Sequence, residues 1–158
     1  MTYDKLLNKL WNMHEQNQGD QYVQYLNEKR ERYINLRDHL GRSFLHVAVE
    51  QGNTLFAEYI LTAGFNPNVK EHCGATPLNI AVAKNNADLC SLLIKCGAAV
   101  RGPLFAGIPS PLEMAKKLQV ADIYDILNPD SSDAEDEDII SYDLSFSQFK
   151  VSSNTKIS

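Results

Sequence analysis

Apolar residues recur along this chain in short stretches with helical spacing. Near the start, they lie at i, i+3 and i+4 intervals: Tyr3, Leu6, Leu7, Leu10 and Trp11. Similar spacing returns over residues 55–61 and 89–94, and a further short helix is expected over residues 121–127. The spacing therefore predicts short amphipathic helices as the main element of the fold.

These stretches repeat with a period near 33 residues. The echo is carried by turn glycines and by one apolar helix position: Gly41 and Gly74, Gly64 and Gly97, and Leu45 and Leu78. A fixed period of this length indicates stacked repeats rather than one globular core. The period also directs the search for function, because such stacks usually present a surface to another macromolecule.

Each clear repeat begins with a tight turn and continues into two helices. Gly41 and Gly74 suit the turn because glycine accepts a positive φ. Thr76 is a favourable N-cap, and Pro77 suits the first helical position, where its missing N–H costs nothing. A glycine then ends the second helix in the manner of a left-handed C-cap.

The segment Gly74-Ala-Thr-Pro-Leu-Asn-Ile-Ala resembles the ankyrin-repeat signature G-x-T-P-L-H-x-A. The preceding repeat keeps the signature histidine as His46 but has Ser43 and Phe44 in place of Thr-Pro. The resemblance implies an all-α solenoid of stacked helix-turn-helix units with short β-turn or hairpin loops. It also implies that His46 bonds the turn and the capping hydroxyl. The residues that carry the motif are Gly41, His46, Gly64, Gly74, Thr76, Pro77, Leu78 and Gly97.

The repeat period predicts five segments. Residues 35–68 and 69–102 are the two clear repeats. Residues 1–34 and 103–128 are expected to be degenerate N-terminal and C-terminal capping repeats, since the outer faces of terminal repeats meet water. The last of these carries one extra residue before Ser110 and Pro111. Residues 129–158 form a tail of different composition.

The tail concentrates the negative charge of the chain. Residues 130–158 hold seven acidic and two basic residues, and the remaining residues balance at zero. The acidic run predicts disorder, because it buries too little apolar surface to offset the entropy of ordering. The apolar–polar alternation over 139–149 leaves three interpretations open: disorder, docking on the chain's own repeats, or strand addition to a partner. Ser132, three residues before Glu135, suits an acid-directed kinase.

Composition and motifs exclude several functions. A neutral body lacks the basic stripe of a nucleic-acid-binding protein, and no apolar run is long enough to span a membrane. His72 and Cys73 lack a second pair of zinc ligands, and no phosphate loop or nucleophile–base set stands out. We therefore expect no enzyme activity, cofactor or metal. Three cysteines without paired spacing, and a start without a signal peptide, favour a cytoplasmic or nuclear protein.

The resemblance implies a binding surface made of turn tips and the concave face of the first helices. By register, this surface contains Asp38, His39, Leu40, Arg42, Glu50, Gln51, His72, Cys73, Ala75, Ala83, Lys84, Phe105, Ile108, Lys117 and Leu118. His39 and His72 are either ligand contacts or exposed tip residues, and Phe105 is either an aromatic anchor or a cover for the end of the core.

Two functions follow from this layout. The first is a monomeric, non-enzymatic protein–protein interaction module, an adaptor or scaffold that holds a protein partner. The alternative is a regulatory inhibitor similar in layout to inhibitor-of-NF-kappa-B proteins, in which the acidic tail contributes to partner masking or turnover.

Overall fold

The computed structural model of the chain describes residues 3–16, 19–101 and 107–131. The chain divides into two compact units, Met1–Leu127 and Asn128–Ser158. In the second unit, the described residues contain the short 3-10 helix Pro129–Ser131. Phe105, Ser132 and the tail over 132–158, on which several expectations rest, lie outside the described residues.

The described part of the first unit is built from paired helices. Their bounds are α1 (Tyr3–Glu15), α2 (Gly19–Glu28), α3 (Arg30–Tyr33), α4 (Phe44–Glu50), α5 (Thr54–Thr62), α6 (Pro77–Ala83), α7 (Ala87–Lys95), α8 (Pro111–Leu118) and α9 (Ala121–Leu127). The helix predicted over 121–127 is confirmed at these residues. The all-α repeat architecture expected from the sequence is confirmed as well.

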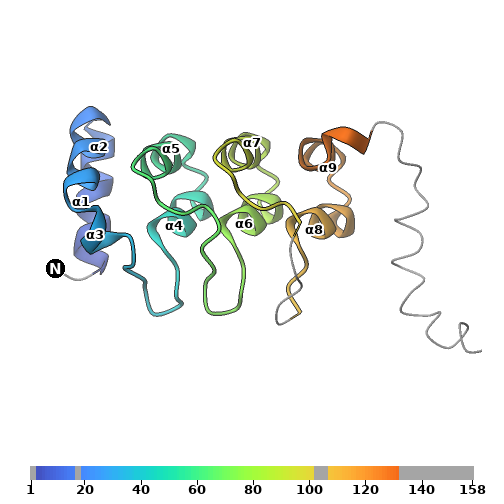
Figure 1. Ribbon diagram of the computed structural model, residues 1–158, viewed down its shortest axis with the longest axis horizontal. Coiled ribbons are helices and arrows are strands. Elements are labelled where there is room, and N and C mark those ends of the chain that lie inside the picture. Colours follow the sequence, from blue (N-terminus) through green and yellow to red (C-terminus); the bar gives the residue numbers. More distant parts are fainter. Residues whose placement is uncertain (1–2, 17–18, 102–106, 132–158) are drawn as a thin grey trace, which may run out of the picture. The chain divides into compact units, whose positions relative to one another are not determined.

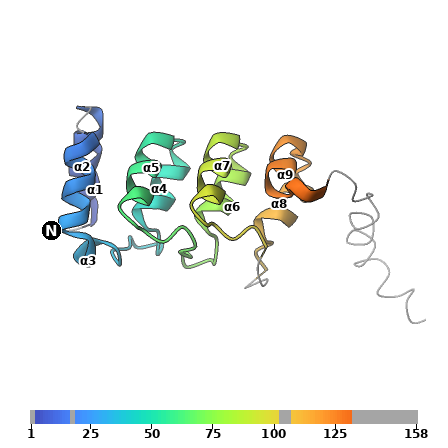
Figure 2. The same ribbon diagram turned by 45° about the horizontal axis from the view of Figure 1, so that its top comes forward.

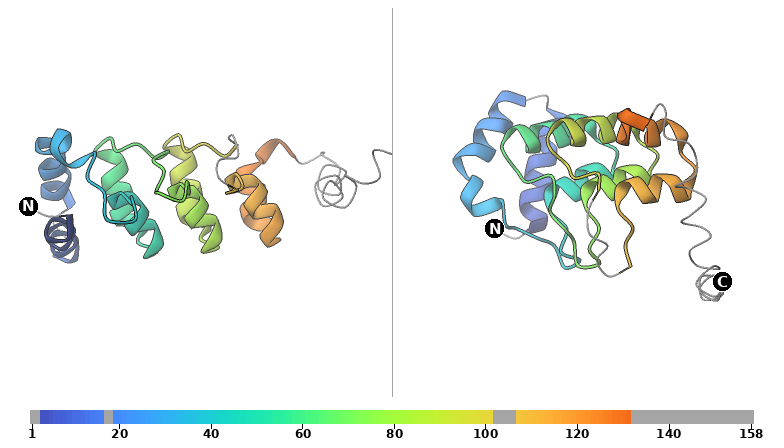
Figure 3. Two further views of the ribbon diagram at one scale, coloured as in Figure 1. Left: turned by 90° about the horizontal axis from the view of Figure 1, so that it is seen from below. Right: turned by 45° about the vertical axis from the view of Figure 1, so that its right-hand side comes forward.

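The helix pairs stack side by side in two rows (Figures 1 and 2). Helices α1, α4, α6 and α8 form the first-helix row, and α2, α5, α7 and α9 form the second-helix row. Within the rows, α4 contacts α6, α6 contacts α8, α2 contacts α5, and α5 contacts α7. The loops that precede α4 and α6 extend beyond the first-helix row, on the side away from the second helices (Figure 3).

Local sequence explains where these helices begin and end. The Asn53 and Asn86 side chains accept hydrogen bonds from the backbone amides of Phe56 and Leu89, which caps α5 and α7. Ser110 and Glu113 form a capping box at the start of α8. Gly64 and Gly97 follow α5 and α7 with φ of +81° and +90°, so the predicted left-handed caps are confirmed.

A continuous apolar core lies between the two rows. Its fully buried large side chains come from every helix pair: Leu6, Leu10, Leu26, Phe44, Phe56, Ile60, Leu78, Leu89, Leu93 and Ile123. The N-terminal pair is joined to this core by aromatic contacts. Tyr3 stacks on Phe44 with ring centroids 4.7 Å apart, and the Trp11 ring meets Phe56 edge-on at 5.5 Å.

The N-terminal capping repeat differs from its expected register. Gly19 begins α2, whereas Gly52, which lies one 33-residue period later, precedes α5 by two residues. The buried Leu26 instead matches Ile60, which lies 34 residues later, and the helix ends Glu28 and Thr62 match in the same way. The short helix α3 was not predicted. This repeat therefore carries a one-residue offset, as does the C-terminal repeat.

Candidate functional site

The turn before α4 is held together by its own charges. One Asp38 carboxylate oxygen accepts hydrogen bonds from the backbone amides of Leu40 and Arg42 at 2.9 and 2.8 Å. The other oxygen accepts a hydrogen bond from Arg42 Nε at 2.7 Å. Burial opposes ionisation of Asp38, but these bonds hold its pKa below the ordinary value. Arg42 also binds the Glu50 carboxylate at the end of α4. The three charged residues thus fix the turn against its helix.

This network reduces the exposure of part of the predicted surface. The Asp38 side chain is only 7% exposed, so its main contribution is to turn geometry rather than to direct contact. Ala75, also predicted as a contact, is buried with 8% exposure. His39 and Leu40 at the tip remain exposed, and Leu40 is 46% exposed despite its apolar side chain.

The turn before α6 repeats this backbone arrangement. Glu71 N donates to Ala75 O at 3.0 Å and Gly74 N to Glu71 O at 2.9 Å, matching the bonds of the preceding turn. The exposed Cys73 thiol donates to the Glu71 carboxylate with Sγ 2.9 Å from Oε1. This bond is the main cause of a raised pKa for the Cys73 thiol, which makes it a poor nucleophile at neutral pH.

Neighbouring turns contact each other directly. His72 N donates to Leu40 O at 3.0 Å. The His72 ring also lies against Gly41, whose φ is +78°, and a Cβ on residue 41 would meet His72 Cδ2 at 2.4 Å. His72 therefore packs on the preceding turn, whereas His39 forms no hydrogen bond with another turn among the described residues. The two histidines share a register position but differ in surroundings.

One buried polar side chain connects each of α4 and α6 to the turn or loop that follows in the stack: His46 in α4 and Asn79 in α6. His46 is fully buried, and its Nδ1 accepts Ser43 N at 3.1 Å while Nε2 lies 3.2 Å from Ala75 O. Because Nδ1 accepts a backbone N–H, Nε2 carries the hydrogen and donates to the carbonyl. Burial lowers the pKa of His46 and keeps the ring neutral. The structural role implied for His46 is confirmed.

Asn79 makes the same set of bonds in the next repeat. Its Oδ1 accepts Thr76 N at 3.0 Å, and its Nδ2 donates to Pro109 O at 3.0 Å. Asparagine thus replaces histidine in this repeat without loss of the connection to the following loop. The turns are consequently held at fixed spacing along the stack.

Exposed side chains gather at the C-terminal ends of the first helices. Glu50 and Gln51 at the end of α4 correspond to Ala83 and Lys84 in α6 and to Lys117 and Leu118 in α8. All six are exposed, and Leu118 is 50% exposed. Within the described ranges, the Lys84 and Lys117 ammonium groups form no ion pair. Ile108, also predicted as a contact, is half-buried.

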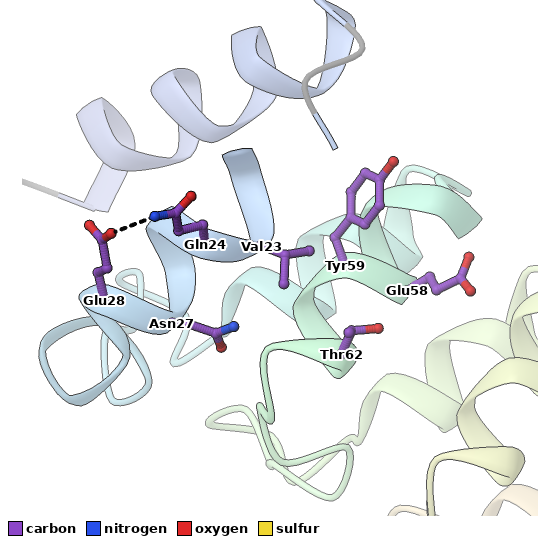
Figure 4. Close-up of a pocket in the computed structure, with 7 residues that line it drawn as sticks. All are labelled: Val23, Gln24, Asn27, Glu28, Glu58, Tyr59 and Thr62. Carbon is purple, nitrogen blue, oxygen red and sulfur yellow. Dashed lines mark hydrogen bonds between the residues drawn. The ribbon is translucent and has the colours of Figure 1, made fainter. Parts of the chain in front are cut away.

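Sequence reasoning missed two features. Asn68 bridges adjacent repeats, because its Oδ1 accepts Ala99 N at 2.7 Å and its Nδ2 donates to Gly97 O at 3.0 Å. The second is an open groove of about 680 Å³ between α2 and α5, shown in Figure 4. Its lining residues lie on helix faces that the repeat signature does not describe.

The described part of the chain shows neither a metal-ligand cluster nor a membrane-spanning helix. Among those residues, no group of three or more His, Cys, Asp or Glu side chains is placed to hold a metal ion. No helix within the described ranges is long and apolar enough to cross a membrane.

The chain is similar in sequence to several known proteins. An ankyrin repeat protein of Fowlpox virus (strain NVSL) is 33% identical over 102 residues, covering 65% of this chain and 23% of the relative. Neurogenic locus notch homolog protein 4 of Homo sapiens is 32% identical over 87 residues, covering 55% of this chain and 4% of the relative. Nuclear factor NF-kappa-B p110 subunit of Drosophila melanogaster is 38% identical over 61 residues, covering 34% of this chain and 6% of the relative. The chain thus aligns with less than a quarter of each relative's length.

The family described as ankyrin repeats (3 copies) matches residues 13–102 and 45–123. These matches cover α2 through α8 and the inter-repeat bonds described above, and repeats of this kind are generally protein–protein interaction modules. The chain belongs to the ankyrin-repeat family.

Proposed function

We propose that this chain is a non-enzymatic adaptor that holds a protein partner on one surface of its repeats. We call this the inner surface and define it by the exposed turn tips and first-helix ends: His39, Leu40, Gln51, His72, Lys84, Lys117 and Leu118. Cys73 and Ile108 are proposed as further contacts, and so is Phe105, which lies outside the described residues. Asp38, Arg42 and Glu50 act mainly by shaping the first turn.

One observation carries this proposal. The buried polar groups of the turns bond to one another and fix the turns in place, while the side chains of the inner surface point outward without ion pairs among the described residues. A rigid display of exposed residues lowers the entropic cost of association. Leu40 and Leu118, at the two ends of the surface, supply exposed apolar area.

The charges of the inner surface indicate the chemistry of the partner. Asp38, Arg42 and Glu50 leave a net negative charge in the first clear repeat, whereas Lys84 and Lys117 place unpaired positive charges in the next two. A partner that presents acidic side chains toward α6 and α8 would match this arrangement.

The test is affinity capture from a cell lysate with the full chain and with a Lys84→Glu, Lys117→Glu double variant. The matched control reverses two exposed lysines outside the inner surface, Lys29→Glu just after α2 and Lys95→Glu at the end of α7. The proposal expects a partner that the first variant loses and the control retains. A partner that both variants retain would place the binding site elsewhere.

A regulatory inhibitor is the second candidate. It is favoured by the net negative charge of residues 130–158 and by the similarity to the NF-kappa-B p110 subunit of Drosophila melanogaster. In this reading, the acidic residues mask a basic surface of the partner, and phosphorylation of Ser132 adds charge. Removing residues 130–158 would then weaken the affinity and flatten its dependence on salt, whereas an adaptor would bind the partner unchanged.

A further inference from the structure

The groove between α2 and α5 lies on the second-helix row, away from the turns of the inner surface (Figures 1 and 4). It is lined by Val23, Gln24, Asn27, Glu28, Glu58, Tyr59 and Thr62. In Figure 4, Val23 and Tyr59 lie between the two carboxylates, Glu28 and Glu58. The groove therefore has an apolar and aromatic centre with an acidic group at each end.

The groove coincides with a polar residue at a position that is apolar in the other second helices. The ends of α2, α5 and α7 fall at Glu28, Thr62 and Lys95, and the residue just before each end is Asn27, Leu61 and Ile94. Leu61 is buried and Ile94 half-buried, but Asn27 is exposed. An amide at this position leaves the seam between α2 and α5 open to water.

The lining has bonding capacity that the described protein does not use. The Asn27 amide and the Thr62 hydroxyl form no hydrogen bond among the described residues. Glu28 accepts one bond from Gln24 Nε2 at 3.1 Å, which leaves most of its acceptor sites for other donors. Two carboxylates and no cation line the groove.

We propose that this groove binds an extended basic segment of a protein partner. Lysine or arginine side chains would pair with Glu28 and Glu58 through charge-assisted hydrogen bonds. The side-chain amides of Gln24 and Asn27 can bond the backbone of an extended chain, since each offers both donors and an acceptor. Because the groove is open along one side, it suits a chain segment better than an enclosed small molecule.

The test uses the full chain and a fluorescent peptide of alternating arginine and alanine, with binding measured by anisotropy. A Glu28→Gln, Glu58→Gln double variant removes both carboxylates without changing side-chain size, and Asn27→Leu fills the groove with the kind of residue present in α5 and α7. The matched control is Asp88→Asn with Asp125→Asn, which changes net charge equally at exposed positions of α7 and α9.

Loss of both carboxylates is expected to weaken peptide binding by about tenfold, since each exposed charge pair contributes a few-fold in affinity. Asn27→Leu is expected to weaken it similarly while the thermal unfolding temperature stays unchanged or rises. The control pair should bind as the unaltered chain does. Equal binding by all variants would assign the peptide to the acidic residues beyond 130 and overturn the proposal. Equal affinity for a peptide with glutamine in place of arginine, or no measurable binding, would overturn it too.

Discussion

Replacing His46 tests the connection between neighbouring repeats. His46→Ala leaves Ser43 N–H and Ala75 C=O buried without the bonds that the imidazole supplied. Ala75 O keeps the bond from Glu71 N, so only Ser43 N–H is left without a partner, and the free energy of unfolding should fall by about 1–3 kcal/mol. His46→Asn should cost less, because Asn79 makes the equivalent bonds in the next repeat. Urea unfolding followed by circular dichroism measures both losses.

Comparing the unaltered chain with His46→Asn also tests whether the buried His46 ring is neutral. Its pKa is lowered from 6.5 in the folded chain by burial, so the unfolded chain takes up this proton at a higher pH. The stabilisation is therefore present above the unfolded pKa and is lost as pH falls toward the folded pKa. Relative to His46→Asn, the unaltered chain should lose stability as the pH falls below 6.5, with a slope of at most about 1.4 kcal/mol per pH unit.

The difference between the two proteins isolates this residue, because the other titrating groups are common to both. Unfolding free energies measured from about pH 7.5 to about pH 5.5 cover the region of proton uptake by the unfolded chain. Equal slopes in the two proteins would mean that His46 is protonated as readily in the folded chain as in the unfolded one. That result would refute the buried bonding pattern on which the stacking of the turns depends.

Two further predictions concern the turns. Gly41→Ala should destabilise the chain more than Gly97→Ala. Both glycines have a positive φ, which costs about 1–2 kcal/mol for alanine, but only an alanine at position 41 would also displace the His72 ring. Chemical denaturation of both variants, with and without His72→Ala, checks this, and equal losses would contradict the packing of His72 on Gly41. Glu71→Gln should speed alkylation of Cys73 by iodoacetamide near neutral pH, because a neutral amide replaces the carboxylate that raises the thiol pKa. An unchanged rate in peptide mapping would show that Glu71 does not protect the thiol.

The repeat architecture could be predicted because its signals are local. The period, the Thr76–Pro77 start of α6 and the glycines after α5 and α7 each act within a few residues, so one sequence is enough to place them. The structural role of His46 followed from its position in the signature. Its partner Ala75 O, 29 residues away, became visible only when two repeats were placed side by side.

The binding surface was less predictable, because register alone does not determine exposure. Asp38 occupies a turn position that the register assigns to the surface, but its side chain bonds Arg42 and is only 7% exposed. Ala75 lies one residue from a tip and is nevertheless covered. The groove at Asn27 was missed because the first repeat departs from the period by one residue, which concealed its correspondence to Leu61.

Footprinting of the captured complex would test the proposed adaptor function most directly. Leu40, Leu118 and Leu55 are 46%, 50% and 44% exposed, so hydroxyl radicals should oxidise them to similar extents in the free chain. Leu40 and Leu118 belong to the inner surface, whereas Leu55 lies on α5 in the second-helix row. Protection of Leu40 and Leu118 by the partner, with Leu55 unchanged, is the predicted result. Protection of Leu55 alone would contradict the proposed inner surface.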